Sequence, residues 1–126
     1  MTMLKEYFAG HEGTAVLSTA DAKGRVDAAI YSKPHLIEGE EIALLMADRL
    51  SYANVQENPY AVYLFMEQGP GWKGKRLYLK KSREERNTEL VRSLIRRTHG
   101  HPEAVNVNLV YFQAEKILPL TGAEKE

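Results

Sequence analysis

Arg49 and Ser51 are the residues whose types and spacing point most directly to binding chemistry. They open the segment 48–59, which follows the apolar run 42–47 and ends at Pro59, where a helix must stop. At the start of a short helix, unpaired backbone N–H groups and the positive end of the dipole would meet a guanidinium and a hydroxyl donor. Such a place suits a phosphate group.

A plainer interpretation of the same segment stays open. Asp48 or Ser51 can serve only as the N-cap of the helix, and Arg49 can be an ordinary surface charge. The spacing alone does not choose between a phosphate site and a capped surface helix.

The composition narrows the classes of protein to which the chain can belong. Its 126 residues predict a single domain, 1–126, and its 17 Lys and Arg balance 17 Asp and Glu, which argues against nucleic acid or an anionic membrane as a partner. Without cysteine there is no disulfide, thiolate nucleophile or cysteine-bound metal. No apolar run reaches the length of about 18 residues that spans a membrane, and the first residues lack a secretion signal, so we expect a cytoplasmic protein.

Alternating and apolar runs predict about six antiparallel strands. In the second of these, the small residues Ala28 and Ala29 suit either the close approach of a ligand or a tight barrel interior. The strand around Tyr63 is apolar on both faces, so it needs cover from the barrel interior and from a helix or a second subunit. The strand-like segments are 14–19, 25–32, 35–37 with 41–47 as a hairpin, 60–66, 75–81 and 105–117.

Three helices are expected beside these strands. Two are short, at 1–10 and 48–58, and one is long, from Ser82 or Arg83 to about His99. This order predicts an α+β fold that is mainly β, a six-stranded antiparallel barrel closing its own edges. The apolar stripe of the long helix consists of Leu90, Val91, Leu94 and Ile95.

With these elements placed, the chain resembles the flavin mononucleotide (FMN)-binding split β-barrel family, the group related to pyridoxamine 5'-phosphate oxidase. The resemblance runs from about Gly13 to Thr121. Its most specific part is Ser51, then Asn54-Val55, then Asn58-Pro59, and the run 110–117 is similar to the family's last strand.

The resemblance implies FMN as the cofactor, a homodimer with the flavins at the subunit interface, and a cofactor site built from three segments. Lys33 would be a phosphate partner, and the loop 69–74 would approach the flavin of the second subunit. The implied cofactor-binding residues are Ala28, Ala29, Ile30, Tyr31, Ser32, Lys33, Met46, Ala47, Asp48, Arg49, Leu50, Ser51, Trp72 and Lys73.

Two departures from the family pattern qualify this interpretation. Leu50-Ser51 stands where many members have adjacent basic residues, which leaves Arg49 as the nearest cation. The basic and histidine pattern with which true pyridoxamine phosphate oxidases grip their substrate is missing near the carboxyl terminus, which argues against that activity.

If flavin binds, it carries the redox reaction, and the protein supplies orientation and electrostatics. We therefore expect one- or two-electron transfer with a nicotinamide or protein donor, without catalytic residues that the sequence can name. Two other classes stay open: a protein that binds or senses haem, deazaflavin or another ligand in the same groove, and a nucleic-acid-binding barrel that uses the basic residues between Lys73 and Arg86. A metal site at His99 and His101 lacks an evident third ligand, so no metal is expected.

Overall fold

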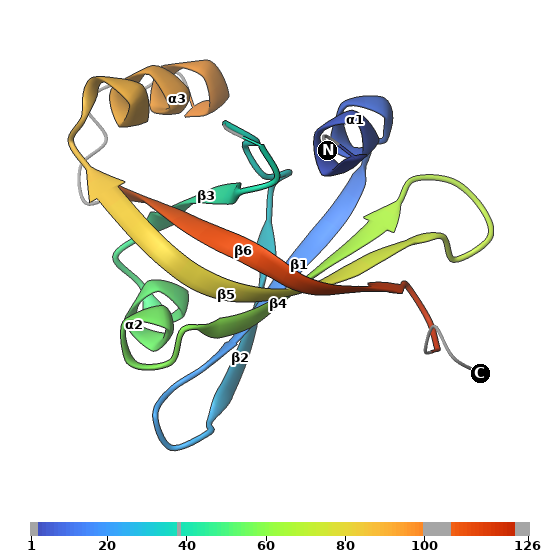
Figure 1. Ribbon diagram of the computed structural model, residues 1–126, viewed down its shortest axis with the longest axis horizontal. Helices are drawn as coiled ribbons and strands as arrows, with labels where there is room; N and C mark the ends of the chain where they lie inside the picture. Colours follow the sequence, from blue (N-terminus) through green and yellow to red (C-terminus); the bar gives the residue numbers. More distant parts are fainter. Residues whose placement is uncertain (1–2, 38, 100–106, 123–126) are drawn as a thin grey trace.

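The computed structural model describes residues 3–37, 39–99 and 107–122. Within these ranges, three helices surround one curled antiparallel sheet of six strands (Figure 1). No helix of the described residues has the length and apolar character needed to cross a membrane. The elements are α1 (Met3–Gly10), β1 (Gly13–Ala20), β2 (Val26–Tyr31), β3 (Ile42–Ala47), α2 (Leu50–Glu57), β4 (Tyr60–Glu67), β5 (Gly74–Arg86), α3 (Glu89–His99) and β6 (Val107–Pro119).

The strand order is β2-β1-β4-β5-β6-β3, so the sheet begins and ends on β2 and β3. The chain reaches β3 from β2 through a segment that touches it at one isolated bridge, where His35 and Ala43 exchange two backbone hydrogen bonds of 2.8 and 2.9 Å. The predicted α+β class and the six antiparallel strands are confirmed, and the sheet forms a curled half-barrel whose edge strands, β2 and β3, do not pair with each other among the described residues. The six-stranded split barrel that the resemblance implies is therefore confirmed, and its two edges are not closed by direct pairing within the described ranges.

The core lies inside the curl of the sheet. Alternate residues of each strand point inward, as the twofold periodicity of a strand requires. On β4, Tyr63 and Phe65 are fully buried, whereas Val62 and Leu64 on the other face are only half-buried. The β6 faces also agree with the sequence pattern, since Val110 and its face-mates join the core while the opposite face packs under α3.

Two predicted elements are wrong. The long helix does not start at Ser82 or Arg83, because 82–86 continue β5, and after a register shift at Ser82 the residues 83–86 pair with β6 from Tyr111 to Asn108. Asn87, with φ of 62°, ends the strand, and Thr88 caps α3 by accepting a hydrogen bond from the Val91 N–H at 3.2 Å. The segment 35–37 is not a strand of a hairpin, because β3 pairs along its length with β6.

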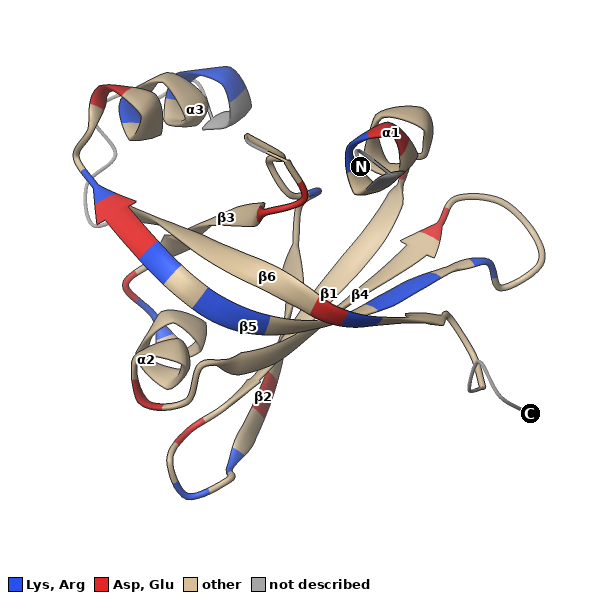
Figure 2. Ribbon diagram, viewed as in Figure 1, with Lys and Arg blue, Asp and Glu red and all other residues tan. Residues whose placement is uncertain are grey.

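The charged residues are unevenly distributed, and many lie along β5 (Figure 2). Among them, Lys81 pairs with Glu84 at 2.6 Å, Arg83 with Glu41 at 3.2 Å, and Arg86 with Asp48 at 2.7 Å. Through Arg83 and Arg86, the second half of β5 is thus joined by ion pairs to residues that flank β3, in addition to its backbone pairing with β6.

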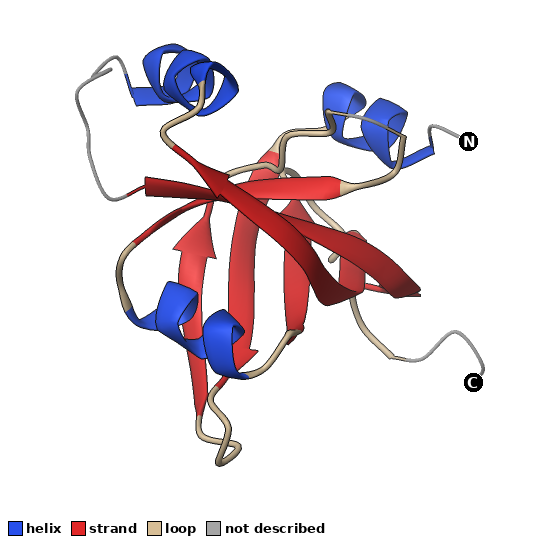
Figure 3. Ribbon diagram, turned by 60° about the vertical axis from the view of Figure 1, so that its left-hand side comes forward, coloured by secondary structure: helices blue, strands red, loops and turns tan. Residues whose placement is uncertain are grey.

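The three helices pack against different parts of the sheet. In Figure 3, α1 and α3 lie at one end of the sheet and α2 lies toward the other. α3 covers the outer face of β3 and β6 through Val91, Leu94 and Ile95 of its predicted stripe. α2 packs against β1 and β2, where it forms one wall of a cleft at the split.

Candidate cofactor cleft at the split of the barrel

A cleft of about 520 Å³ lies between the two edge strands and the start of α2. One wall is β2, and the other is formed by β3, the opening of α2 and the start of β6. Its volume falls within the range of about 300–1,000 Å³ that is usual for small-molecule sites. The lining residues are Asp27, Ala29, Ile30, Tyr31, Ser32, Leu45, Ala47, Arg49, Leu50, Ser51 and Val107.

The short helix α2 is held in place by the residues that carried the resemblance. Asn54 is buried and donates a hydrogen bond from Nδ2 to Thr19 Oγ1 at 3.0 Å, and Val55 packs into the core. Asn58 ends the helix with its N–H on the Asn54 carbonyl at 2.8 Å and then accepts the Tyr60 N–H at 3.1 Å. These contacts fix the helix so that its amino-terminal end faces the cleft.

The first turn of α2 has no side-chain cap. Arg49 is the N-cap residue, and its side chain caps no backbone N–H group of the helix. The prediction that Asp48 or Ser51 caps the helix is wrong, because each side chain bonds elsewhere. Since the first N–H groups of a helix lack intrahelical partners, the N–H groups of the first turn remain available to an anion at the cleft.

Arg49 adds a cation to this end of the cleft. Its side chain lines the cleft and is exposed, next to the uncapped helix start. A guanidinium beside free N–H groups suits a phosphate or carboxylate. This is the arrangement expected from the spacing of Arg49 and the helix.

Ser51 is used differently from the expectation. It is 7% exposed, and its hydroxyl donates to Asp27 Oδ2 of β2 at 3.2 Å, which bridges the two walls. Burial raises the pKa of the neighbouring Tyr31; the Ser51 hydroxyl acts in the opposite direction, and the Asp27 carboxylate adds to the rise. The Asp27 carboxylate suits hydroxyl or N–H donors of a ligand, whereas the Arg49 end suits its anion.

Away from the start of α2, the cleft is lined largely by apolar residues of β2, β3 and β6. Ala29 of β2 faces Leu45 and Ala47 of β3, with Val107 of β6 beside them, and Ile30 borders the cleft at the next position of the edge strand. The alternative that Ala28 and Ala29 fill a closed barrel interior is wrong, because β2 is an edge strand on which Ala28 is exposed and Ala29 faces the cleft. An apolar wall with a cationic end fits a ligand that has a flat ring system and an anionic tail.

Several predicted residues lie outside the cleft. Met46 is fully buried in the core, and Ala28 points to the opposite side of β2 from Ala29. Lys33 donates from Nζ to the carbonyl oxygens of Phe8 at 2.8 Å and His11 at 3.0 Å and pairs with Glu12. These residues therefore support the fold rather than line the cleft.

The remaining predicted residues are Asp48, Trp72 and Lys73. Asp48 points toward β5 and β6, where it accepts hydrogen bonds from Arg86 and Asn108. Trp72 lies in the β4–β5 loop with φ of 51° and is 74% exposed, and Lys73 follows it in the same loop. The loop is separate from the cleft of this chain, so its expected contact would be with a second subunit.

Three cleft residues were missed. Asp27 lies two positions before Ala29 on the same face of β2, and Leu45 lies two before Ala47 on β3, so strict alternation would have found both. Val107 gave no local signal, because it reaches the cleft only by pairing with Ala47 across β3 and β6.

The described residues contain no group of three or more acidic or histidine side chains placed to hold a metal. The alternative metal site at His99 and His101 lies outside the residues whose side chains the structure describes.

Comparison with known proteins shows which solved structures share this fold. No protein-family model and no curated protein matches the sequence. Among solved structures, an FMN-binding protein from Syntrophomonas wolfei subsp. wolfei aligns with a TM-score of 0.73 at 21% identity, over 98% of this chain and 84% of that chain. The haem storage protein HutZ from Vibrio cholerae aligns with a TM-score of 0.71 at 20% identity, over 92% of this chain and 91% of that one. An F420 reductase aligns with a TM-score of 0.67 at 9% identity, over 89% and 94% of the two chains.

At these identities the likeness is one of fold. The chain has the split β-barrel fold of FMN-binding proteins, which pyridoxamine 5'-phosphate oxidase-like proteins share. The fold that the sequence resemblance implied is therefore confirmed. The three proteins named above bind or act on different cofactors, so the fold alone does not choose the ligand.

Proposed function

We propose that this protein is an FMN-binding flavoprotein that acts as an oxidoreductase. The observation that carries the proposal is the cleft at the split, where an apolar wall ends at an uncapped helix start with Arg49 beside it. In this assignment Ala29 and Leu45 would hold the ring system, with Ile30 at the border of the cleft, and Arg49 and the N–H groups of the first turn would hold the phosphate. Bound flavin would supply the electron transfer.

The residues of the cleft favour flavin over haem. Haem iron requires an axial His, Met, Cys or Tyr ligand. Among the described residues that line the cleft, only Tyr31 is of these types, and burial raises the pKa of its hydroxyl and so disfavours the phenolate that would bind iron. A cationic end and an apolar wall, in contrast, match the phosphate and the ring system at the two ends of FMN.

The proposal includes a homodimer. Exposed apolar side chains, among them Val26 at 82% and Ile30 at 70%, lie on the edge strand β2, and Trp72 stands out from the β4–β5 loop. A further apolar cavity of about 330 Å³ lies beside Val26, Tyr60 and Val62 on the outer side of the sheet. Exposed apolar patches of this kind are typical of protein interfaces, and a second copy would cover both β2 and the cavity. Light scattering of the purified protein measures whether its mass is that of one chain or two.

The visible absorption spectrum tests the cofactor. The protein is purified, mixed with excess FMN, freed of unbound ligand and compared with the untreated sample. We expect the bands of oxidised flavin at about one flavin per chain, because one cleft is present in each chain. Retention of haem or of deazaflavin with no retention of FMN would replace the proposal with a ligand-binding or sensing role. Reduction of bound flavin by a nicotinamide or a protein donor then tests the enzymatic part.

A further inference from the structure

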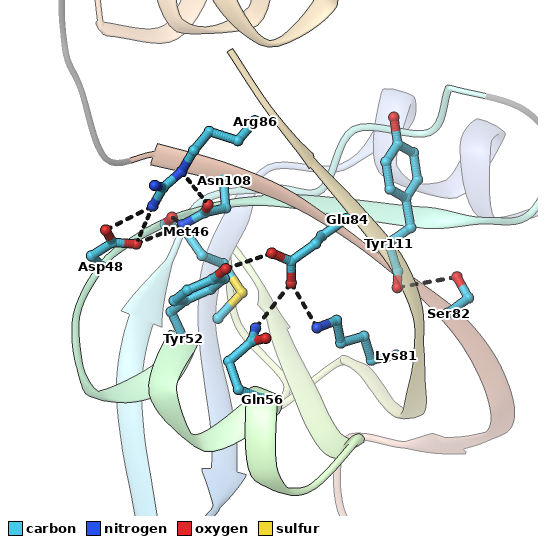
Figure 4. Close-up of polar contacts among 10 residues, drawn as sticks. All are labelled: Met46, Asp48, Tyr52, Gln56, Lys81, Ser82, Glu84, Arg86, Asn108 and Tyr111. Carbon is cyan, nitrogen blue, oxygen red and sulfur yellow. Dashed lines mark hydrogen bonds and ion pairs between the residues drawn. The ribbon is translucent and has the colours of Figure 1, made fainter. Parts of the chain in front are cut away.

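A row of polar side chains crosses three strands behind the cationic end of the cleft (Figure 4). Arg86 on β5 pairs in register with Asn108 on β6, which in turn pairs in register with Met46 on β3. Arg86 Nε donates to Asn108 Oδ1 at 2.8 Å, and Asn108 Nδ2 donates to the Met46 carbonyl at 3.1 Å. The row therefore runs from the far strand to the last residues of β3.

The row ends on Asp48, the residue before the N-cap of α2. Arg86 Nη2 lies 2.7 Å from each carboxylate oxygen of Asp48, and Asn108 Nδ2 donates to Asp48 Oδ1 at 2.9 Å. Arg49, the next residue, donates its own N–H to the Ala47 carbonyl at 2.7 Å. The turn that carries Arg49 is thus held by the side chain of Asp48 and by the N–H group of Arg49.

Asn108 is the buried centre of this arrangement. It is 1% exposed, and both ends of its amide are used, one as acceptor from Arg86 and the other as donor to Met46 and Asp48. A buried amide whose groups are satisfied holds its neighbours in one geometry. Asn108 therefore transmits the position of Arg86 to the turn.

The row also has an electrostatic effect. Asp48 is adjacent in sequence to Arg49, so its negative charge lies near any anion bound at the helix start. Hydrogen bonds from Asn108 and Arg86 lower the pKa of Asp48, which keeps it ionised. Arg86 offsets that charge directly. Without Arg86, the carboxylate would oppose Arg49 in binding an anion.

We propose that Arg86 is a positioning residue for phosphate recognition, which acts through Asp48 and Asn108 to fix the turn of Arg49 and to neutralise the carboxylate beside it. The proposal rests on the proposed function, because it concerns the same cleft. Arg86 does not line the cleft, so its effect is on the geometry and field of the site rather than through contact with ligand.

A second network on β5 provides an internal contrast. Glu84 accepts hydrogen bonds from the Tyr52 hydroxyl at 2.5 Å, from Gln56 at 2.9 Å and from Lys81 at 2.6 Å (Figure 4). These contacts hold the body of α2 rather than the turn before it. Loss of the Glu84 contacts should loosen the helix without exposing a charge beside the phosphate.

The test compares the affinities of FMN and riboflavin, which differ by the phosphate, for the wild type and for single variants. Arg86→Gln should weaken FMN binding about ten-fold or more while riboflavin changes by less than about two-fold, because the lost interactions act on the phosphate end. Arg86→Lys keeps the charge and should retain the larger part of the FMN affinity. The effect of Arg86→Gln should shrink as salt is added.

Arg83→Gln is the matched control. Arg83 lies on the same strand with similar exposure and pairs with Glu41 and Glu85, away from the turn. It should leave the ratio of the two affinities unchanged. In the double variant Asp48→Asn with Arg86→Gln, removal of the carboxylate should restore part of the FMN affinity that Arg86→Gln loses.

Two results would overturn the proposal in different ways. If Arg86→Gln weakens FMN and riboflavin equally, Arg86 supports only the fold, and the proposed function survives. If the wild type binds neither flavin, the proposed function and this inference fall together.

Discussion

The two walls of the cleft are built in different ways. On the β3 side, Met46 is fully buried, the turn at Asp48 is held by Arg86 and Asn108, and α2 is fixed through Asn54. On the β2 side, an edge strand presents alternate exposed residues, with Ile30 at 70%. One wall is therefore held by many contacts within the chain, and the other is largely exposed.

The two sides of the site should therefore govern different properties of the protein. Substitutions on the β3 side should change the stability of the fold and the precision of anion binding together. Substitutions on the β2 side should affect the stability of the isolated chain little, because few contacts are lost there.

The largest contrast is expected from truncating one apolar residue in each of the two strands that border the cleft, β3 and β2. Met46→Ala should lower the free energy of unfolding by about 2–5 kcal/mol, since it leaves a cavity in the core. Ile30→Ala should change it by about 0.5 kcal/mol or less, as is usual for an exposed side chain. Urea unfolding at an unchanged m value measures both. Equal losses in the two variants would show that β2 is as well packed as β3.

A smaller loss is expected when the buried amide is removed. Asn108→Ala leaves the Met46 carbonyl, Asp48 and Arg86 without a shared partner, which should cost about 1–3 kcal/mol of unfolding free energy. Ser32→Ala, on the opposite wall, serves as the control. The expectation fails if the urea midpoints of the two variants coincide.

The effect of Arg49 should fall on binding alone. Arg49→Ala should weaken FMN binding by about 1–3 kcal/mol through loss of a charge-assisted contact, with no change in the unfolding midpoint. Titration of the apoprotein with FMN, followed by flavin fluorescence, measures the affinity. Unchanged affinity would remove Arg49 from the phosphate site.

The smallest effect concerns the stability of the β3 side at high pH. The hydrogen bond to Glu84 raises the pKa of Tyr52 to about 12, above the value of about 10 of an unfolded tyrosine. The folded state thus keeps a proton that the unfolded state loses, so the contribution of Tyr52 to the free energy of unfolding is complete below pH 10 and disappears as the pH rises toward 12.

Tyr52→Phe should cost about 1 kcal/mol of unfolding free energy at pH 7 and flatten the alkaline loss of stability, measured by urea unfolding from pH 7 to 11.5. Tyr60→Phe, which changes an exposed tyrosine, is the control, and parallel pH profiles for Tyr52→Phe and wild type would refute the assignment.

The sequence predicted those parts of the molecule that depend on local patterns. The hairpin between β1 and β2, the apolar faces of β6, the apolar stripe of α3 and the short helix α2 follow from alternation, helical spacing and turn residues. Applied to β3, the same alternation would have predicted Leu45 rather than Met46 as a residue of the cleft, since neighbouring residues of a strand face opposite sides.

Other parts depend on pairing between distant segments. The run 82–86 is rich in charged residues, and its pattern predicts a helix. It forms a strand instead, because backbone pairing with β6 and ion pairs outweigh its local preference for a helix. Asn108 and Arg86 carry no local motif, and their link to Asp48 arises only after β5, β6 and β3 lie side by side. No spacing rule could have named them.

The pairing of β3 with β6 also has a consequence for synthesis of the protein. Met46 and its partner Asn108 are 62 positions apart, so the ribosome releases β3 well before it makes the strand that β3 pairs with. At translation rates of about 5–20 residues per second, the apolar strand Ile42–Ala47 stays without its partner for several seconds. The turn at Asp48 acquires its contacts with Asn108 only after β6 is made, so a nascent chain that ends before Val107 can form the β1–β2 and β4–β5 hairpins but not the cleft.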